Sequence, residues 1–341
     1  MTIGEAILAG EKQLVAAGID SGRLETEMML AQLREEPRLN LWLQRDAVLT
    51  EGQREKLQDW LARRSTREPI QHILGWAPFL DFELHVTRDV LVPRPETEVL
   101  AQLAIQRLAG AAAPRVLDWG TGSGCLALAI AQAVPSAEVH ALDISSDALR
   151  IARANAIAYR LADRVRFHLG DGFDALNQQS AASGNGAADS LSSTRGGGEG
   201  RGEEVPPRLS SPLSPTLSPF VPLGAREQPG VRSGRAPFDL IVTNPPYIPA
   251  AEVETLDPEV RLHDPRLALV GGDDGLDCYR RLATEALAWL RPGGSLLAEF
   301  GDGQAPALAE LFGKTGWVVE AVEKDLSGRD RILIVRAPVR D

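Results

Sequence analysis

The N-terminal quarter of the chain carries apolar residues three or four positions apart, which is the spacing of one face of a helix. The first such stripe contains Ile3, Ile7, Leu8, Leu14 and Val15, and Gly18 marks its end. Further on, Thr50 and Gln53 form a capping-box pattern that opens a helix through Leu57, Trp60 and Leu61. Because residues 1–74 contain no cluster of titratable side chains, we predict a small helical domain that docks a partner and performs no chemistry.

After residue 74 the pattern changes. Gly75–Phe79 predicts a turn, and the alternation of Phe82–Val86 predicts one strand of a small hairpin. We therefore expect residues 75–92 to connect two domains. From Pro93 onward, short apolar runs alternate with helical patterns, which is typical of a doubly wound α/β sheet. The second predicted domain is residues 93–341.

Residues 177–236 interrupt this alternation. Ser, Pro, Gly and Arg dominate the segment, and Phe220 is its only aromatic residue. Such a composition buries too little apolar surface to offset chain entropy, so we predict a disordered insertion. It comes directly before the apolar run 238–243, so we expect it to leave from the amino edge of the sheet. Ligands of such sheets bind at the carboxyl edge, so the insertion is predicted to be dispensable.

Length, charge, cysteine spacing and the length of apolar runs argue against a nucleic-acid-binding, metal-binding or membrane-spanning protein. The 341 residues are enough for two domains that each bury a core. With 36 basic and 47 acidic side chains, the net charge is -11, which argues against nucleic acid as the main partner because that binding neutralises phosphates. Cys125 and Cys278 lie far apart without metal-ligand spacing, so we expect no metal and a reduced, cytoplasmic location. No apolar run approaches the ~20 residues that span a bilayer, so no membrane segment is expected.

The clearest chemical signal follows the apolar run Phe238–Thr243, which predicts a buried strand. Asn244, Pro245, Pro246 and Tyr247 come next, and two prolines without N–H donors must end the strand pairing. The Asn244 side-chain oxygen and the carbonyl near Pro245 suit the two N–H bonds of a planar amino group, which Tyr247 covers. An ordinary turn, in which Asn244 only caps the strand end, is the alternative interpretation.

A second signal lies upstream, where Arg115–Trp119 predicts a strand and Cys125–Val134 an Ala-rich helix. Between them, the loop Gly120–Gly124 has glycine at alternate positions, which lets the backbone approach a ligand at a helix N-terminus. A further strand ends in Asp143, about twenty residues beyond the loop, where an acidic side chain is placed to accept both hydroxyls of a ribose. This arrangement predicts a nucleoside site. An ordinary βαβ unit with a surface Asp is the alternative.

Together the two signals resemble the class I S-adenosylmethionine-dependent methyltransferases that carry an Asn-Pro-Pro-aromatic motif and methylate planar nitrogen. Three further stretches narrow the resemblance: Val92–Glu98, Asp257–Leu269 and Gly271–Leu276. In this order they resemble the peptide chain release factor N5-glutamine methyltransferases, the PrmC/HemK type, over residues 1–176 and 237–341. The resemblance implies a Rossmann-like α/β sheet of seven strands behind a small N-terminal helical domain.

For the cofactor, S-adenosylmethionine, we expect the loop to face the methionyl end through Gly120, Thr121, Gly122, Ser123 and Gly124. Asp143 is expected at the ribose, and Asp171 with Gly172 at the adenine. Some relatives have Trp at the position of Gly172, so Phe173 is considered as the aromatic wall instead. The implied catalytic and substrate-binding set is Asn244, Pro245, Pro246 and Tyr247, with Asn244 also beside the cofactor.

The implied activity is methyl transfer to the glutamine side-chain amide in the Gly-Gly-Gln motif of release factors, with the release factor as protein partner. The main alternative is an N-methyltransferase for adenine or guanine amino groups in DNA or RNA, because the Asn244 turn serves such amines equally well. The acidic balance counts against that alternative. A third interpretation is a binding module that keeps the fold without catalysis. The intact glycine loop, Asp143 and Asn244 argue against it.

Overall fold

The computed structural model describes residues 1–176 and 237–339. The prediction for residues 177–236 lies outside the described residues. Leu176 is buried and marks the end of the first described range, and the second resumes at Pro237, directly before a central strand of the sheet.

Five helices form the N-terminal part: α1 (Ile3–Ala16), α2 (Gly22–Arg34), α3 (Arg38–Leu43), α4 (Glu51–Ser65) and α5 (Ile70–Leu74). Ile3, Ile7 and Leu14 point into a common core, as predicted. Leu8 and Val15, expected on the same stripe, are 59% and 50% exposed. Each lies about 100° around the helix from the preceding buried residue, so it faces solvent. At Thr50 both hydrogen bonds of the predicted capping box are present.

A two-stranded hairpin follows. β1 (Trp76–Phe79) pairs antiparallel with β2 (Phe82–His85). The turn predicted at 75–79 is therefore wrong, because the chain turns at Leu80 and Asp81. Ala77 and Phe79 alternate with the exposed Pro78 and are buried, which makes a strand of these residues. A proline is tolerated here because the strand lies at an edge.

The larger sheet has seven strands in the order β5-β4-β3-β6-β7-β9-β8. Their bounds are β3 (Arg115–Trp119), β4 (Glu138–Asp143), β5 (Val165–Leu169), β6 (Phe238–Thr243), β7 (Leu290–Glu299), β8 (Val318–Lys324) and β9 (Asp330–Arg336). Strands β3 to β7 are parallel, and β9 runs antiparallel between β7 and β8. The predicted fold class is confirmed: an α/β doubly wound sheet behind a helical N-terminal region.

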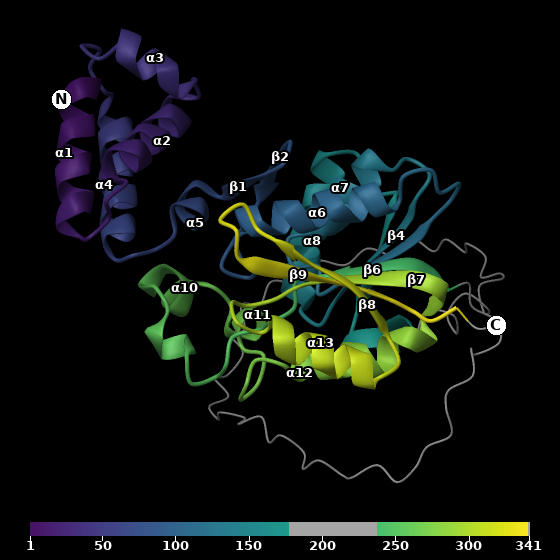
Figure 1. Ribbon diagram of the computed structural model, residues 1–341. Coiled ribbons are helices and arrows are strands. Elements are labelled where there is room, and N and C mark those ends of the chain that lie inside the picture. Colours follow the sequence, from purple (N-terminus) through teal and green to yellow (C-terminus); the bar gives the residue numbers. More distant parts are fainter. Residues whose placement is uncertain (177–236, 340–341) are drawn as a thin grey trace, which may run out of the picture.

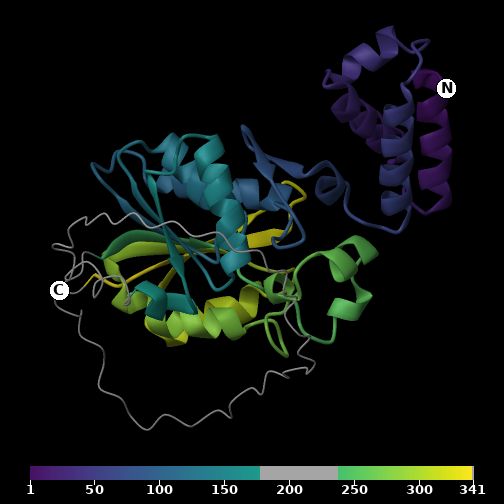
Figure 2. The same ribbon diagram turned by 180° about the vertical axis from the view of Figure 1, so that it is seen from behind.

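Helices cover both faces of this sheet (Figures 1 and 2). On one face lie α6 (Pro95–Arg107), α7 (Cys125–Ala133) and α8 (Ser146–Ala158). On the other lie α12 (Asp277–Glu285) and α13 (Ala305–Lys314). Short turns of 3-10 helix occur at η1 (Gly172–Asp174), η2 (Val253–Thr255) and η3 (Ala286–Ala288). Since β3 to β7 are parallel, their carboxyl ends meet at one edge, which is where ligands bind in such folds.

One excursion leaves this edge after β6. It contains η2, α10 (Pro258–His263) and α11 (Arg266–Leu269), and an isolated parallel bridge between Ile248 and Val270 closes its base. The Ile248 N–H donates to the Leu269 carbonyl (3.0 Å), and the Gly271 N–H donates to the Ile248 carbonyl (2.9 Å). The two ends of the excursion therefore meet close to the sheet, and α10 extends toward the helical N-terminal part (Figure 1).

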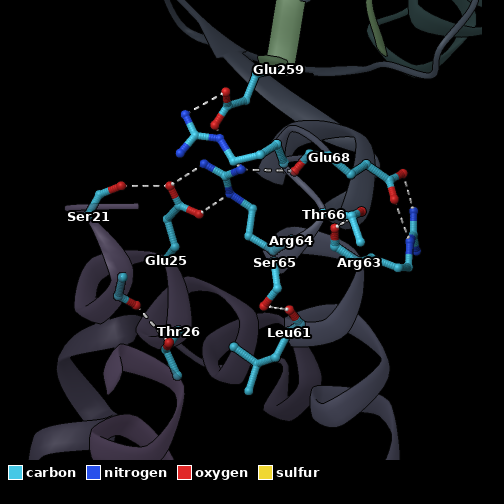
Figure 3. Close-up of polar contacts among 12 residues, drawn as sticks. Ser21, Glu25, Thr26, Leu61, Arg63, Arg64, Ser65, Thr66, Glu68 and Glu259 are labelled. Atoms are coloured by element: carbon cyan, nitrogen blue, oxygen red, sulfur yellow. Dashed lines mark hydrogen bonds and ion pairs between the residues drawn. The ribbon is translucent and has the colours of Figure 1, made fainter. Parts of the chain in front are cut away.

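The contact between α10 and the N-terminal helices is ionic (Figure 3). Arg64 of α4 is buried and binds Glu25 of α2 through Nε and Oε2 at 2.5 Å. The same guanidinium donates to Glu259 of α10 (Nη1–Oε1, 3.0 Å), whose second oxygen accepts from Arg67 (2.8 Å). We call Glu25, Arg64, Arg67 and Glu259 the interdomain cluster.

Candidate functional site at the carboxyl edge of the sheet

The glycine loop lies between β3 and α7, as predicted. Gly120, Gly122 and Gly124 all have positive φ (+77°, +54° and +87°), a conformation that favours glycine. A Cβ at Gly124 would also approach the Ala152 Cβ to 3.2 Å. Below the loop, fully buried Asp118 accepts from the Thr121 hydroxyl (2.6 Å) and the Ala127 N–H (3.1 Å). These bonds hold the loop against the start of α7.

Asp143, at the end of β4, faces this loop. Its Oδ2 accepts from the Gly122 N–H (2.8 Å) and its Oδ1 from the Ser145 N–H (2.9 Å). Burial raises the pKa of this carboxyl above its ordinary value, against the effect of these backbone hydrogen bonds. Asp143 therefore already fixes the glycine loop, and its carboxylate keeps acceptor capacity for a ligand.

Asn244 follows β6 directly. The strand end is fixed by Thr243, whose hydroxyl donates to the Trp119 carbonyl of β3 (2.6 Å). The Asn244 amide donates through Nδ2 to Thr97 Oγ1 of α6 (3.1 Å). Thr97 in turn donates to Glu299 Oε2 at the end of β7 (2.8 Å). The Asn244 side chain is thus held from two neighbouring elements.

Two cavities meet at Asn244. The first, about 390 Å³, is lined by the glycine loop, Asp143 and Pro246. The second, about 630 Å³, is lined by Tyr247 and by the end of β7. Asn244 borders both cavities, whereas Pro245 is buried and lines neither. The predicted residues therefore separate into two groups: the glycine loop and Asp143 face the first cavity, and Tyr247 faces the second.

The Tyr247 side chain is uncharged at neutral pH, which suits contact with an uncharged substrate group. Burial, and then the charge of Glu299, raise the pKa of its phenol to about 12, so the side chain stays protonated at neutral pH. Gln304 holds the backbone of this residue by donating to the Tyr247 carbonyl (3.0 Å). The aromatic face is thereby fixed at the border of the second cavity.

The residues after β5 differ from the expectation in two respects. Asp171 borders the first cavity, but its carboxylate forms an ion pair with Arg281 of α12 and is 70% exposed. An adenine contact would require this carboxylate to be shared with Arg281. Phe173, considered as an aromatic wall, is instead buried in the core and stacks on Trp289 with 5.7 Å between ring centroids. Phe173 is not among the residues that line the cavity.

Sequence reasoning did not identify the contacts that connect these groups. Thr97 and Glu299 hold Asn244, and Trp119 lines the first cavity. Arg94, which borders both cavities, pairs with Asp264 after α10 (Nη2–Oδ2, 2.7 Å). The stretches Val92–Glu98 and Asp257–Leu269 had been singled out, but a local pattern does not reveal which of their members form a pair.

Buried acids dominate the electrostatics of the site. Burial raises the pKa of Asp118 to about 7 against its hydrogen bonds with Thr121 and Ala127. Burial also raises the pKa of Glu299 to about 7, although its hydrogen bond with Thr97 and the charge of Arg331 act in the opposite direction. Asp264 behaves similarly, because burial raises its pKa to about 6 despite Arg94. Such clusters of perturbed carboxyl groups are typical of functional sites.

Within residues 1–176 and 237–339, no group of three or more His, Cys, Asp or Glu side chains is arranged to hold a metal ion. No helix in these ranges combines the length and the apolar character that crossing a membrane requires.

The sheet order, the glycine loop and the cavity at the carboxyl edge define an α/β protein of the class I methyltransferase fold. A family model described as a methyltransferase domain matches residues 112–190, and one described as the PrmC N-terminal domain matches residues 5–75. A relative from Geobacter sulfurreducens, named release factor glutamine methyltransferase, is 35% identical over 94% of this chain and 91% of its own length. A relative of the same name from Deinococcus radiodurans is 35% identical over 98% and 99%, respectively.

The chain belongs to the release factor glutamine methyltransferase family. Among solved structures, a release factor-specific protein-(glutamine-N5) methyltransferase from Alicyclobacillus acidocaldarius is 27% identical. That match covers 75% of this chain and 99% of the other, with a TM-score of 0.36.

Proposed function

We propose that this protein transfers a methyl group from S-adenosylmethionine to the side-chain amide nitrogen of a glutamine in peptide chain release factors. One observation carries the chemistry: Asn244 stands between two cavities, with its amide held by Thr97. The names of the relatives support the choice of substrate. The glutamine of the Gly-Gly-Gln motif is the residue that the family resemblance implies.

The first cavity suits the cofactor. Its volume of about 390 Å³ lies in the range of small-molecule sites. A Cβ added at Gly120 or Gly122 would meet no atom within 4 Å, so the glycines leave open space along the loop. Asp143 offers an acceptor at the end of β4, where a ribose hydroxyl would bind. We assign the glycine loop to the methionyl end, Asp143 to the ribose, and Asp171 with Gly172 to the adenine.

This assignment predicts weaker cofactor binding in Asp143→Ala. Losing a charged hydrogen-bond acceptor corresponds to roughly a tenfold to hundredfold rise in the dissociation constant. Calorimetry with S-adenosylmethionine measures it, and circular dichroism checks that the fold is retained. Unchanged binding by a folded variant contradicts the ribose role.

The second cavity suits a protein loop and not a polyanion. Its charged residues are mostly acidic: Glu96, Glu252, Asp274, Glu299 and Asp302, against Arg94 and Arg331. A nucleic-acid strand would bring phosphates toward these carboxylates, and no array of basic side chains faces them here. The domain division stays a proposal: residues 1–74 dock the release factor, 75–92 connect, and 93–341 perform the transfer.

In the proposed reaction, bound S-adenosylmethionine supplies an electrophilic methyl group on sulfur. The glutamine amide nitrogen displaces the sulfur from the methyl carbon, so an N–C bond forms, the C–S bond breaks and the sulfur keeps the electron pair. Asn244 Oδ1 and the Pro245 carbonyl accept the two N–H bonds, which orients the nitrogen and places negative dipoles where positive charge develops. One of these N–H protons is then released to water. Tyr247 covers the flat amide.

The experiment is methyl transfer from radiolabelled S-adenosylmethionine to a release factor, with ribosomal RNA and DNA as separate acceptors. We expect label on the release factor, lost when the glutamine of its Gly-Gly-Gln motif is changed to glutamate. Label on nucleic acid alone overturns the proposed substrate. We place the reaction in the cytoplasm with its substrate, and Cys125 and Cys278 are both free thiols, which suits a reduced compartment.

A further inference from the structure

We propose that Thr97 and Glu299 are positioning residues that fix which end of the Asn244 side-chain amide faces the substrate. The inference rests on the proposed function, because it concerns the same Asn244. An amide side chain has two ends of opposite character, an oxygen that accepts and an NH₂ group that donates. Only the oxygen is able to bind the N–H of a glutamine amide.

The hydrogen-bond chain determines the orientation. Thr97 has one hydroxyl proton, and it donates this proton to Glu299 Oε2 (2.8 Å). Only lone pairs of Oγ1 then remain for Asn244, so the group that contacts Thr97 must be the Nδ2 donor, at 3.1 Å. Asn244 also lowers the pKa of Glu299, which is the effect of its donor end directed toward the carboxylate. Oδ1 is thereby directed away from both residues.

The ionised form of Glu299 is necessary for this orientation. A protonated Glu299 would donate to Thr97, which would then be free to donate its own proton to Asn244. That arrangement stabilises the reversed amide, with Oδ1 toward Thr97 and NH₂ toward the substrate. The two amide orientations are therefore distinguished only when Glu299 carries its charge.

The position of Glu299 suits this role. Its side chain is 1% exposed and its backbone carbonyl accepts from the Tyr279 hydroxyl (2.5 Å), so strand β7 and helix α12 hold it in place. The titratable or charged groups that face it are Arg331, Glu96, Tyr247, Tyr279 and Cys125. Burial raises the pKa of Tyr247 and of Cys125 to about 12, and raises that of Tyr279 well above its ordinary value, so these three stay neutral near pH 7.

The experiment compares wild type with Glu299→Gln, Thr97→Val and Thr97→Ser. Single-turnover methyl transfer is measured at saturating cofactor and release factor between about pH 6 and 9. Thr26→Val is the matched control, since Thr26 is also a buried threonine whose hydroxyl donates within the protein, to the Gly22 carbonyl (2.7 Å), but it lies in the helical part. Cofactor binding by calorimetry and melting temperature are recorded for each variant.

We expect the wild-type rate to rise about tenfold per pH unit below the pKa of Glu299 and to level off above it. Glu299→Gln should lack this rise and stay roughly 10- to 100-fold below the wild-type plateau, with cofactor binding unchanged. Thr97→Val should be slowed with its rise moved to higher pH, because it loses the hydrogen bond that lowers the pKa of Glu299. Thr97→Ser should keep the wild-type rate and profile, and so should Thr26→Val.

A second readout does not depend on turnover. Carbon-13 NMR of the glutamate carboxyl groups, with the signal assigned by its absence in Glu299→Gln, should show a titration near pH 7 that moves upward in Thr97→Val. An active wild type whose acid-side decline persists in Glu299→Gln overturns the inference alone, since another buried acid, such as Asp118 or Asp264, would then be the titrating group. A wild type that transfers no methyl group at any pH overturns the proposed function, and the inference with it.

Discussion

Two glutamates, the buried Glu299 at the sheet edge and the half-buried Glu259 in the interdomain cluster, are stabilised in opposite ways. Glu259 accepts from Arg64 and Arg67. Burial alone would raise the pKa of Glu259, but its backbone hydrogen bond and these two arginines lower it below its ordinary value. Glu299 has the neutral neighbours Thr97 and Asn244, and burial raises its pKa to about 7 although both of them lower it. The paired carboxylate joins two parts of the chain, whereas the carboxylate without a bound cation titrates near neutral pH.

The difference between the two pKa values indicates that Glu299 lowers stability where a function needs it, whereas Glu259 does not. A carboxylate held by guanidinium groups keeps its charge at any physiological pH, which suits a constant structural contact. A buried carboxylate without such a partner is unfavourable in its charged form, and groups of this kind occur where a reaction needs them. The substitutions below test whether the two glutamates have these separate roles.

The largest effect is expected from Asn244→Ala, which removes the group that Glu299 is proposed to orient. Turnover should fall by roughly 10²–10³-fold, the scale of losing one preorganised polar contact. Steady-state methyl transfer measures it, with Asn40→Ala in α3 as a control for asparagine loss outside the site. Turnover within a few-fold of wild type would remove the basis for any special role of Glu299.

Glu299→Gln is expected to stabilise the protein at alkaline pH. The folded-state pKa of Glu299, about 7, lies above the ordinary value of 4.5, so the folded protein binds this proton more tightly than the unfolded chain. Stability should therefore fall as pH rises from about 4.5 to about 7, and the glutamine variant lacks this loss. The advantage of the variant should reach about 3 kcal/mol above neutrality and vanish near pH 4. Urea unfolding at several pH values measures it.

Glu310→Gln on α13 is the matched control, because Glu310 is exposed and pairs with Lys314 on the same helix. Its small effect on stability should not depend on pH in this window. If the free-energy difference between Glu299→Gln and wild type stays constant from acid to alkaline pH, Glu299 does not carry a raised pKa.

Glu259→Gln should weaken the interdomain cluster without touching the chemistry. Glu25 still pairs with Arg64 in this variant, so we expect a loss of only about 1 kcal/mol in unfolding free energy. The KM for the release factor should rise several-fold, while kcat and cofactor affinity stay within twofold of wild type. A fall in kcat with unchanged KM would mean that the cluster acts on the active site directly, which the comparison with Glu299 does not predict.

The smallest effect is expected from deleting residues 178–234, which leaves both glutamates and their partners in place. Methyl-transfer rate and melting temperature should match those of the full chain. A deleted variant that folds but has lost activity would show that the segment acts in docking or regulation, contrary to the expectation from its position before β6.

The parts of the fold that the sequence predicted are those with strong local signals. Continuous apolar runs such as Phe238–Thr243 can bury both faces only as central strands, and the structure confirms them. Gly75 and Pro78 favour a turn at β1, but Ala77 and Phe79 are buried and the segment pairs as a strand. Local composition does not determine which residues a short segment packs against.

The polar pairs of the site could not be predicted from the sequence for the same reason. Thr97 and Glu299 are 202 positions apart, and Arg94 and Asp264 are 170 apart. Each residue taken alone fits an ordinary helix start or strand end, and only the folded sheet brings the partners together. The predicted roles of Asp143, Asp171 and Asn244 stay predictions until ligand binding and turnover are measured.

The bridge between Ile248 and Val270 bears on how such an enzyme diversifies. Residues 249–269 leave the sheet and return to it at one point, so their length and charge can change without moving the register of any strand. Asn244 lies on the sheet side of the bridge, and Glu259 lies within the excursion. Selection for a new protein partner can therefore act on the part of the excursion around Glu259, while Asn244 and the strand register are inherited unchanged.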